Sequence, residues 1–87
     1  MERYELRVKP SVAKDLRNVP REDVQRIVAR MESLRDDPRP PGSEKLTSRD
    51  HYRVRQGDYR ILYTIGDAEL PVEVLKVGHR RDVYREA

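Results

Sequence analysis

The amino-acid sequence predicts a small α+β fold with the element order β-α-α-β-β-β, in which two helices pack on one face of an antiparallel meander sheet. Three observations support this class. Apolar and charged residues alternate near the N-terminus, apolar residues then recur at helical spacing in two stretches, and three strand-like stretches fill the second half of the chain. Such a sheet is covered on one face only, so its other face is open for binding.

The 87 residues suit one domain spanning residues 1–87, because a core of this size just supports independent folding. The chain has no cysteine, which excludes disulfides and thiolate metal sites and favours the cytoplasm. Its N-terminal stretch, MERYELRVKP, lacks a continuous apolar run, so we expect neither an export signal nor a membrane partner. The formal charge of +3 is small, so any binding of nucleic acid depends on where the cations lie.

The first strand is predicted in RYELRVK, residues 3–9. Its apolar residues alternate with charged ones and therefore share a buried face: Tyr4, Leu6 and Val8. Pro10 ends the strand, and Ser11 is the expected N-cap of a short helix. The apolar residues of that helix form one stripe: Val12, Ala13, Leu16 and Val19.

A second helix is predicted from Pro20 onward, because proline is favoured in the first turn and Glu22 and Asp23 lie at the positive end of the helix dipole. Its apolar face consists of Val24, Ile27, Val28, Met31 and Leu34. The stretch DDPRPPGSEK, residues 36–45, cannot continue the helix because it contains three prolines and a glycine, so we expect a loop there.

Three strands follow, in HYRVRQ, YRILYTI and VEVLKVG, joined by Gly57-Asp58 and by GDAELP. A two-residue turn at Gly57-Asp58 sets the register of the first pair: Arg55 faces Arg60, and Arg53 faces Leu62. The residues that point to the helices are Tyr52, Val54, Tyr59, Ile61 and Tyr63. The register therefore places three arginines together on the open face.

Arg53, Arg55 and Arg60 are unexpected neighbours, because like charges placed opposite each other destabilise a strand pair by a few tenths to about 1 kcal/mol. In one interpretation they keep the open face soluble or pair with Glu73 or Asp82. We prefer an anion site, since guanidinium groups match phosphate geometry and stay charged, and since a solubilising face would mix signs.

The C-terminal stretch GHRRDVYREA adds His79, Arg80, Arg81 and Tyr84 beyond the last strand, where Gly78 allows a bend toward the arginines. These groups suit RNA cleavage by attack of a 2′-hydroxyl on the neighbouring phosphate, which requires charge stabilisation and proton transfer. With two histidines and no clustered carboxylates, we expect no metal or other cofactor.

Three stretches resemble the RelE/ParE toxin superfamily, on its RelE side: DPRPPGSEKL, YRVRQGDYRILY and VLKVGHRRDVY. The predicted element order is also that of this family. RelE-type toxins are ribosome-dependent endoribonucleases that cut mRNA in the A site, and a cognate RelB-type antitoxin holds them inactive. The resemblance implies the same activity here, with ribosome, mRNA and antitoxin as partners and with DNA contacted only through the antitoxin complex.

By the same resemblance, Arg60 and Arg80 stabilise the phosphorane, Tyr84 orients the 2′-hydroxyl or stacks on a base, and Arg53 and Arg55 hold phosphate. Some relatives have lysines in the YRxR strand that can act as general bases, whereas arginine does not give up its proton.

The general base is therefore open. His79 is the candidate replacement, because imidazole exchanges protons near neutral pH, and His51 is a weaker one at the outer end of its strand. Further RNA-phosphate contacts are expected at Lys45, Arg49 and Arg81, with solvated surface as an equal alternative.

Two other functions stay open. One is a ParE-like gyrase inhibitor, which has the same fold and does not need the arginine and tyrosine constellation. The other is a non-catalytic module that binds an antitoxin and represses transcription with it.

Overall fold

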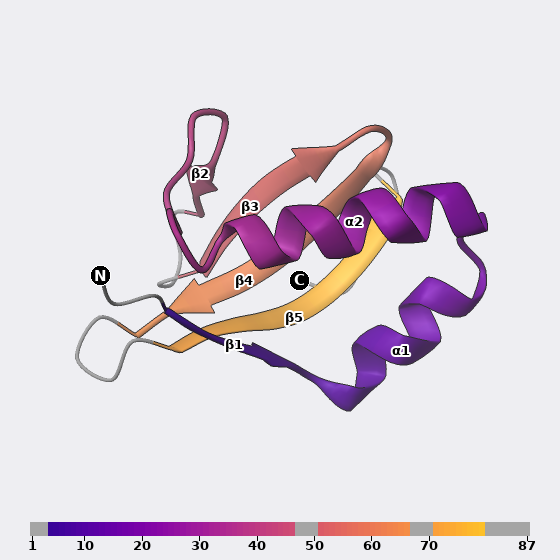
Figure 1. Ribbon diagram of the computed structural model, residues 1–87, viewed down its shortest axis with the longest axis horizontal. Helices are drawn as coiled ribbons and strands as arrows, with labels where there is room; N and C mark the ends of the chain where they lie inside the picture. Colours follow the sequence, from indigo (N-terminus) through magenta and orange to yellow (C-terminus); the bar gives the residue numbers. More distant parts are fainter. Residues whose placement is uncertain (1–3, 47–50, 67–70, 80–87) are drawn as a thin grey trace.

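The computed structural model describes residues 4–46, 51–66 and 71–79. Within these ranges two helices and five strands follow one another as β1 (Glu5–Val8), α1 (Pro10–Arg17), α2 (Arg21–Ser33), β2 (Glu44–Lys45), β3 (His51–Gln56), β4 (Tyr59–Ile65) and β5 (Pro71–His79). The strands form one sheet in the order β1-β5-β4-β3-β2, and α2 runs across it (Figure 1). The predicted α+β class is confirmed, with β2 as an additional strand.

The sheet is mixed. β3, β4 and β5 form the expected antiparallel meander, whereas β1 pairs parallel with β5, with Leu6 opposite Val72. The predicted antiparallel meander is therefore confirmed, and the parallel pairing of β1 adds a feature that the sequence analysis did not assign. Parallel neighbours need a long connection, and here the two helices and three strands lie between β1 and β5 in the chain.

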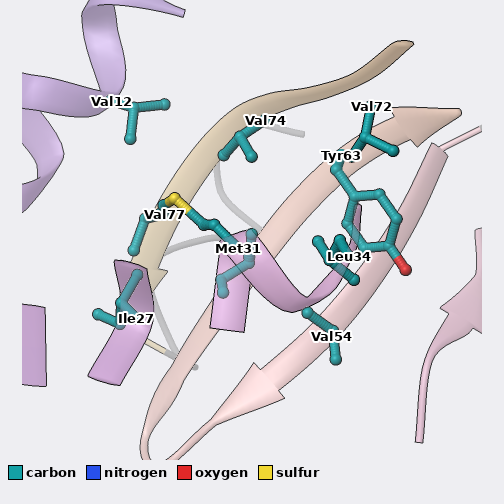
Figure 2. Close-up of a cluster of buried hydrophobic side chains, with 10 residues drawn as sticks. Val12, Ile27, Met31, Leu34, Val54, Tyr63, Val72, Val74 and Val77 are labelled. Atoms are coloured by element: carbon teal, nitrogen blue, oxygen red, sulfur yellow. The ribbon is translucent and has the colours of Figure 1, made fainter. Parts of the chain in front are cut away.

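The core lies between the helices and one face of the sheet (Figure 2). Helix residues and strand residues are buried together in it: Val12, Ile27, Met31, Leu34, Val54, Ile61, Tyr63, Val72, Val74 and Val77. The strand members point toward the helices because side chains alternate between the two faces of a strand. The opposite face carries the arginines and no helix of the described chain.

The start of α1 differs from the prediction. Lys9 is the N-cap, Pro10 is the first helical residue, and no side chain caps this end. The prediction of Ser11 as N-cap is wrong, because proline already fits the first helical position. The start of α2 is as predicted, with Pro20 before the helix and Glu22 and Asp23 in its first turn.

The buried stripe of α2 is narrower than predicted. Ile27 and Met31 are buried, whereas Val28 is 44% exposed because it lies one residue around the helix from Ile27. Val8 is 45% exposed at the end of the edge strand β1. The prediction that Val8 and Val28 belong to the buried faces is therefore wrong.

Neither of the two described helices is long and apolar enough to cross a bilayer.

A β-bulge in β5 lets its valines reach the core. The pairing with β4 shifts between Leu62 and Tyr63, which leaves Leu75 without a cross-strand partner. Val74 and Val77 are three residues apart and would point to opposite faces of a regular strand. With the extra residue at Leu75, both face the helices.

Asp15 joins α1 to this bulged strand. The Val77 N–H donates a hydrogen bond to Asp15 Oδ2 at 3.1 Å, and Lys76 Nζ lies 3.6 Å from Asp15 Oδ1. Both charged side chains are largely buried. One carboxylate therefore satisfies a backbone donor of β5 and a lysine at once, which anchors the helix against the sheet.

The stretch 36–45 is not only a loop. Tyr63 of β4 donates a hydrogen bond from its hydroxyl to the Pro38 carbonyl oxygen at 2.7 Å, and the Tyr63 and Tyr52 rings stack with centroids 5.8 Å apart. The chain then pairs with β3 through β2, with Glu44 opposite Arg53. These contacts bring a carboxylate to the rim of the open face.

Candidate functional site

The hairpin register is the one predicted from the turn. Arg55 lies opposite Arg60, and Arg53 lies opposite Leu62. Gly57 in the turn has φ +61°, a conformation that glycine adopts without strain. The prediction that Arg53, Arg55 and Arg60 share the open face is confirmed.

The three arginines line a pocket of about 360 Å³ together with Gly42 and Glu44. β3 supplies Arg53 and Arg55, β4 supplies Arg60, and β2 supplies Glu44. Gly42 precedes β2 with φ +91°, so the loop turns there without a side chain at the pocket wall. Three guanidinium groups around one pocket can bind a phosphate group by charge-assisted hydrogen bonds.

Glu44 is the member of the pocket that the sequence did not reveal. Arg53 Nη2 donates a hydrogen bond to Glu44 Oε2 at 2.6 Å. That hydrogen bond and the Arg53 charge hold the pKa of Glu44 below its ordinary value, and the charges of Arg55 and Arg60 act in the same direction. The pocket therefore contains an ionised carboxylate among its cations.

His79 does not join the arginines. It lies opposite Tyr59, and the two rings meet edge to face with centroids 5.9 Å apart. Tyr59 packs against the core, so His79 lies on the helix side of the sheet. The expectation that His79 complements the arginine face is wrong, because the bulge at Leu75 reverses which residues of β5 face the helices.

Lys45 also lies apart from the pocket. It pairs with Tyr52, which packs against the core, whereas the neighbouring Glu44 pairs with Arg53. The register therefore puts Lys45 on the helix side of β2, away from the arginine pocket, and its contact with RNA phosphate stays a prediction. His51 does lie on the arginine side, opposite Thr64.

The remaining candidates are Arg49, Arg80, Arg81 and Tyr84, and all four lie outside the described residues. Within the described ranges, no group of three or more His, Cys, Asp or Glu side chains is arranged to hold a metal ion. The described part of the site is therefore an arginine pocket with one carboxylate.

Solved structures that are similar to this chain include toxins and toxin–antitoxin complexes. A chain of the RelBE2 complex from Mycobacterium tuberculosis is 27% identical, with a TM-score of 0.79 over 90% of this chain and 99% of that one. A chain of the archaeal RelE-RelB complex from Pyrococcus horikoshii is also 27% identical, with a TM-score of 0.81 over 91% and 97%. A doubly substituted E. coli RelE in the free state is 25% identical, with a TM-score of 0.78 over 100% and 95%.

Sequence comparison agrees with this likeness. Toxin RelG from Mycobacterium tuberculosis is 47% identical over 34 residues, which are 39% of this chain and 39% of RelG. The family model described as the ParE toxin of type II toxin-antitoxin systems matches residues 6–84. That match covers nearly the whole chain, including both helices, the arginine hairpin and β5. The chain belongs to the RelE/ParE superfamily of type II toxins.

Proposed function

We propose that this toxin is a ribosome-dependent endoribonuclease that cleaves mRNA in the A site and so inhibits translation. The observation that carries the proposal is the pocket lined by Arg53, Arg55 and Arg60 on a face that no described helix covers. The similarity of this chain to E. coli RelE, which extends over the whole chain, also supports the proposed nuclease activity.

In the proposed reaction, the 2′-oxygen of one nucleotide forms a bond to the adjacent phosphorus, and the bond from phosphorus to the departing 5′-oxygen breaks. A proton leaves the 2′-hydroxyl and another reaches the 5′-oxygen. Arg55 and Arg60 stabilise the added negative charge of the phosphorane, with Arg80 and Tyr84 completing the site. Because the arginines neutralise this charge, the mechanism uses no metal ion.

A RelB-type antitoxin is the proposed partner that keeps the toxin inactive. The solved complexes from Mycobacterium tuberculosis and Pyrococcus horikoshii contain Rel antitoxins bound to chains with this fold. The ribosome is the proposed second partner, because a small pocket cleaves RNA efficiently only when the message is held in a reactive geometry. Both partners place the proposed activity in the cytoplasm.

The test is to induce the protein without an antitoxin and to map the 5′ ends of cellular mRNA. We expect new ends at a fixed position within codons of translated messages. Arg60→Ala and Tyr84→Ala should abolish them. Arg26→Ala is the matched control, because this arginine is exposed on α2 and only approaches Asp23 at 4.0 Å, so cleavage should persist. Toxicity of the wild type without new mRNA ends would refute the proposal.

Inhibition of DNA gyrase is the second candidate, favoured by the match of the ParE family model to residues 6–84. The same induction distinguishes the two activities. A DNA-damage response without mRNA cleavage would support gyrase inhibition. Absence of any toxicity would instead support a non-catalytic module that binds an antitoxin.

A further inference from the structure

The ion pair between Glu44 and Arg53 puts an anion of the protein itself into the arginine pocket. The two side chains are 2.6 Å apart at Glu44 Oε2 and Arg53 Nη2, and both line the pocket. The Glu44 side chain is 59% exposed, whereas that of Arg53 is 24% exposed. The carboxylate thus approaches a partly buried guanidinium from the solvent side.

A phosphate group of RNA would approach Arg53 from the same side. Carboxylate and phosphate oxygens bind guanidinium groups through the same N–H donors. A donor that is occupied by Glu44 is not available to phosphate. Glu44 also acts on the rest of the pocket, since Arg55 and Arg60 are close enough to lower its pKa by their charges. Its negative charge reduces the attraction of the whole pocket for an incoming anion.

We propose that Glu44 is a specificity-determining residue, which occupies Arg53 in the free toxin and must be displaced before RNA phosphate gains all three arginine contacts. This inference rests on the proposed function, because it concerns RNA as the ligand of the pocket. RNA in solution competes poorly with a carboxylate that is already in place. RNA held next to the pocket by a ribosome has a high effective concentration and displaces it.

The alternative role for Glu44 is that of the missing proton acceptor. An exposed carboxylate that accepts a hydrogen bond from arginine is a weak base, since that contact holds its pKa below the ordinary value. The two roles predict different results when the carboxylate is removed. As a competitor, Glu44 weakens binding of free RNA, and its loss strengthens it. As a base, its loss would stop cleavage of ribosome-bound mRNA, which the competitor role does not predict.

The experiment measures binding of the purified full chain to a short fluorescent oligoribonucleotide carrying 2′-O-methyl groups, which cannot be cleaved by 2′-hydroxyl attack. Glu44→Gln removes the charge, and Glu44→Ala also removes the hydrogen-bond acceptor. Glu5→Gln is the matched control. Glu5 lies on the same face at the far edge of the sheet, pairs with Arg7 at 3.2 Å, and has a side chain that is also 59% exposed. Thermal unfolding checks that each variant is folded.

We expect both Glu44 variants to bind the oligonucleotide about two- to fivefold more tightly than the wild type at a fixed salt concentration. The slope of log K against log salt should steepen by about 0.7, because one more phosphate of a single strand is neutralised. Glu5→Gln should leave this slope unchanged.

Two results would overturn the inference. One is that Glu44→Gln and Glu5→Gln have the same affinity and salt slope. The other is that Glu44→Gln binds like the wild type but no longer cleaves ribosome-bound mRNA, which would make Glu44 the proton acceptor. Because binding is measured on uncleavable RNA, failure of the proposed nuclease function would appear separately, as absent mRNA cleavage by the wild type.

Discussion

Arg55 and Arg60 lie directly opposite each other in the antiparallel pair of β3 and β4. Neighbouring cations at such positions lower the stability of a sheet, by up to about 1 kcal/mol for an exposed pair. The arrangement therefore indicates a compromise between the stability of the hairpin and the charge of the pocket.

Replacing Arg55 with glutamate should stabilise the fold and impair binding. An opposite-charge pair with Arg60 replaces a repulsive one, so the free energy of unfolding should rise by about 0.2–1 kcal/mol. Urea unfolding measures this change, and titration with the oligonucleotide should show weaker binding. Arg55→Gln removes only the repulsion and should give a smaller increase. A loss of stability in both variants would contradict this account of the pair.

Tyr63→Phe should destabilise the fold by about 1–3 kcal/mol, because the buried Pro38 carbonyl loses the hydroxyl that donates to it at 2.7 Å. Denaturant unfolding measures the difference. The pocket should also change, because the loop that leads to Glu44 is fastened at Pro38. A variant as stable as the wild type would show that another donor replaces the hydroxyl.

The Tyr63 hydroxyl should also make stability depend on alkaline pH. Burial raises its pKa from 10.0 to about 12 in the folded protein. Between these values the unfolded chain loses the proton and the folded chain keeps it, so the contribution of Tyr63 to stability is full below pH 10 and is lost as the pH rises to 12. The stability difference between wild type and Tyr63→Phe should fall over this range. A constant difference would contradict the prediction.

Asp15→Ala should loosen α1 from β5. It leaves the Val77 N–H without its acceptor, which costs about 1–3 kcal/mol for a buried donor. Asp15→Asn keeps an oxygen acceptor and loses only the attraction to Lys76, so it should cost less. Hydrogen exchange of the Val77 amide measures the protection that its hydrogen bond to Asp15 provides. We expect faster exchange in the alanine variant than in the asparagine variant, and the reverse order would be evidence against the assignment.

Ile27→Ala and Val28→Ala form a matched pair of adjacent substitutions. Ile27 is fully buried, so its truncation should cost about 2–5 kcal/mol. Val28 is exposed, so its truncation should change stability by no more than about 0.5 kcal/mol. Thermal unfolding of the two variants checks the contrast. An equal loss of stability in the two variants would contradict the exposure of Val28.

The hairpin could be predicted because its determinants are local. A two-residue turn at Gly57-Asp58 permits only one pairing register for the two flanking strands. Alternation then assigns each side chain to a face of the sheet. The second helix could also be predicted, from the helical spacing of its apolar residues. The parallel pairing of β1 was not, because strand direction across a long connection depends on packing of distant segments.

Other features depend on contacts between distant residues. β2 has two residues, too few for any periodic pattern, and exists because its backbone pairs with β3. Glu44 therefore looked like part of a loop. The bulge at Leu75 does leave a signal in the sequence, because Val74 and Val77 are three residues apart and so break strict alternation. If a bulge is assumed there, alternation from Val77 places His79 on the helix side.

The bond between Val77 and Asp15 has a further consequence at the sheet edge. β1 ends at Val8, opposite Val74, while β5 continues to His79. A strand that outruns its neighbour exposes backbone donors to which a strand of another molecule can add. At Val77 the carboxylate of α1 already occupies the donor. The helix therefore leaves one backbone donor fewer on this edge with which a strand of another molecule could pair.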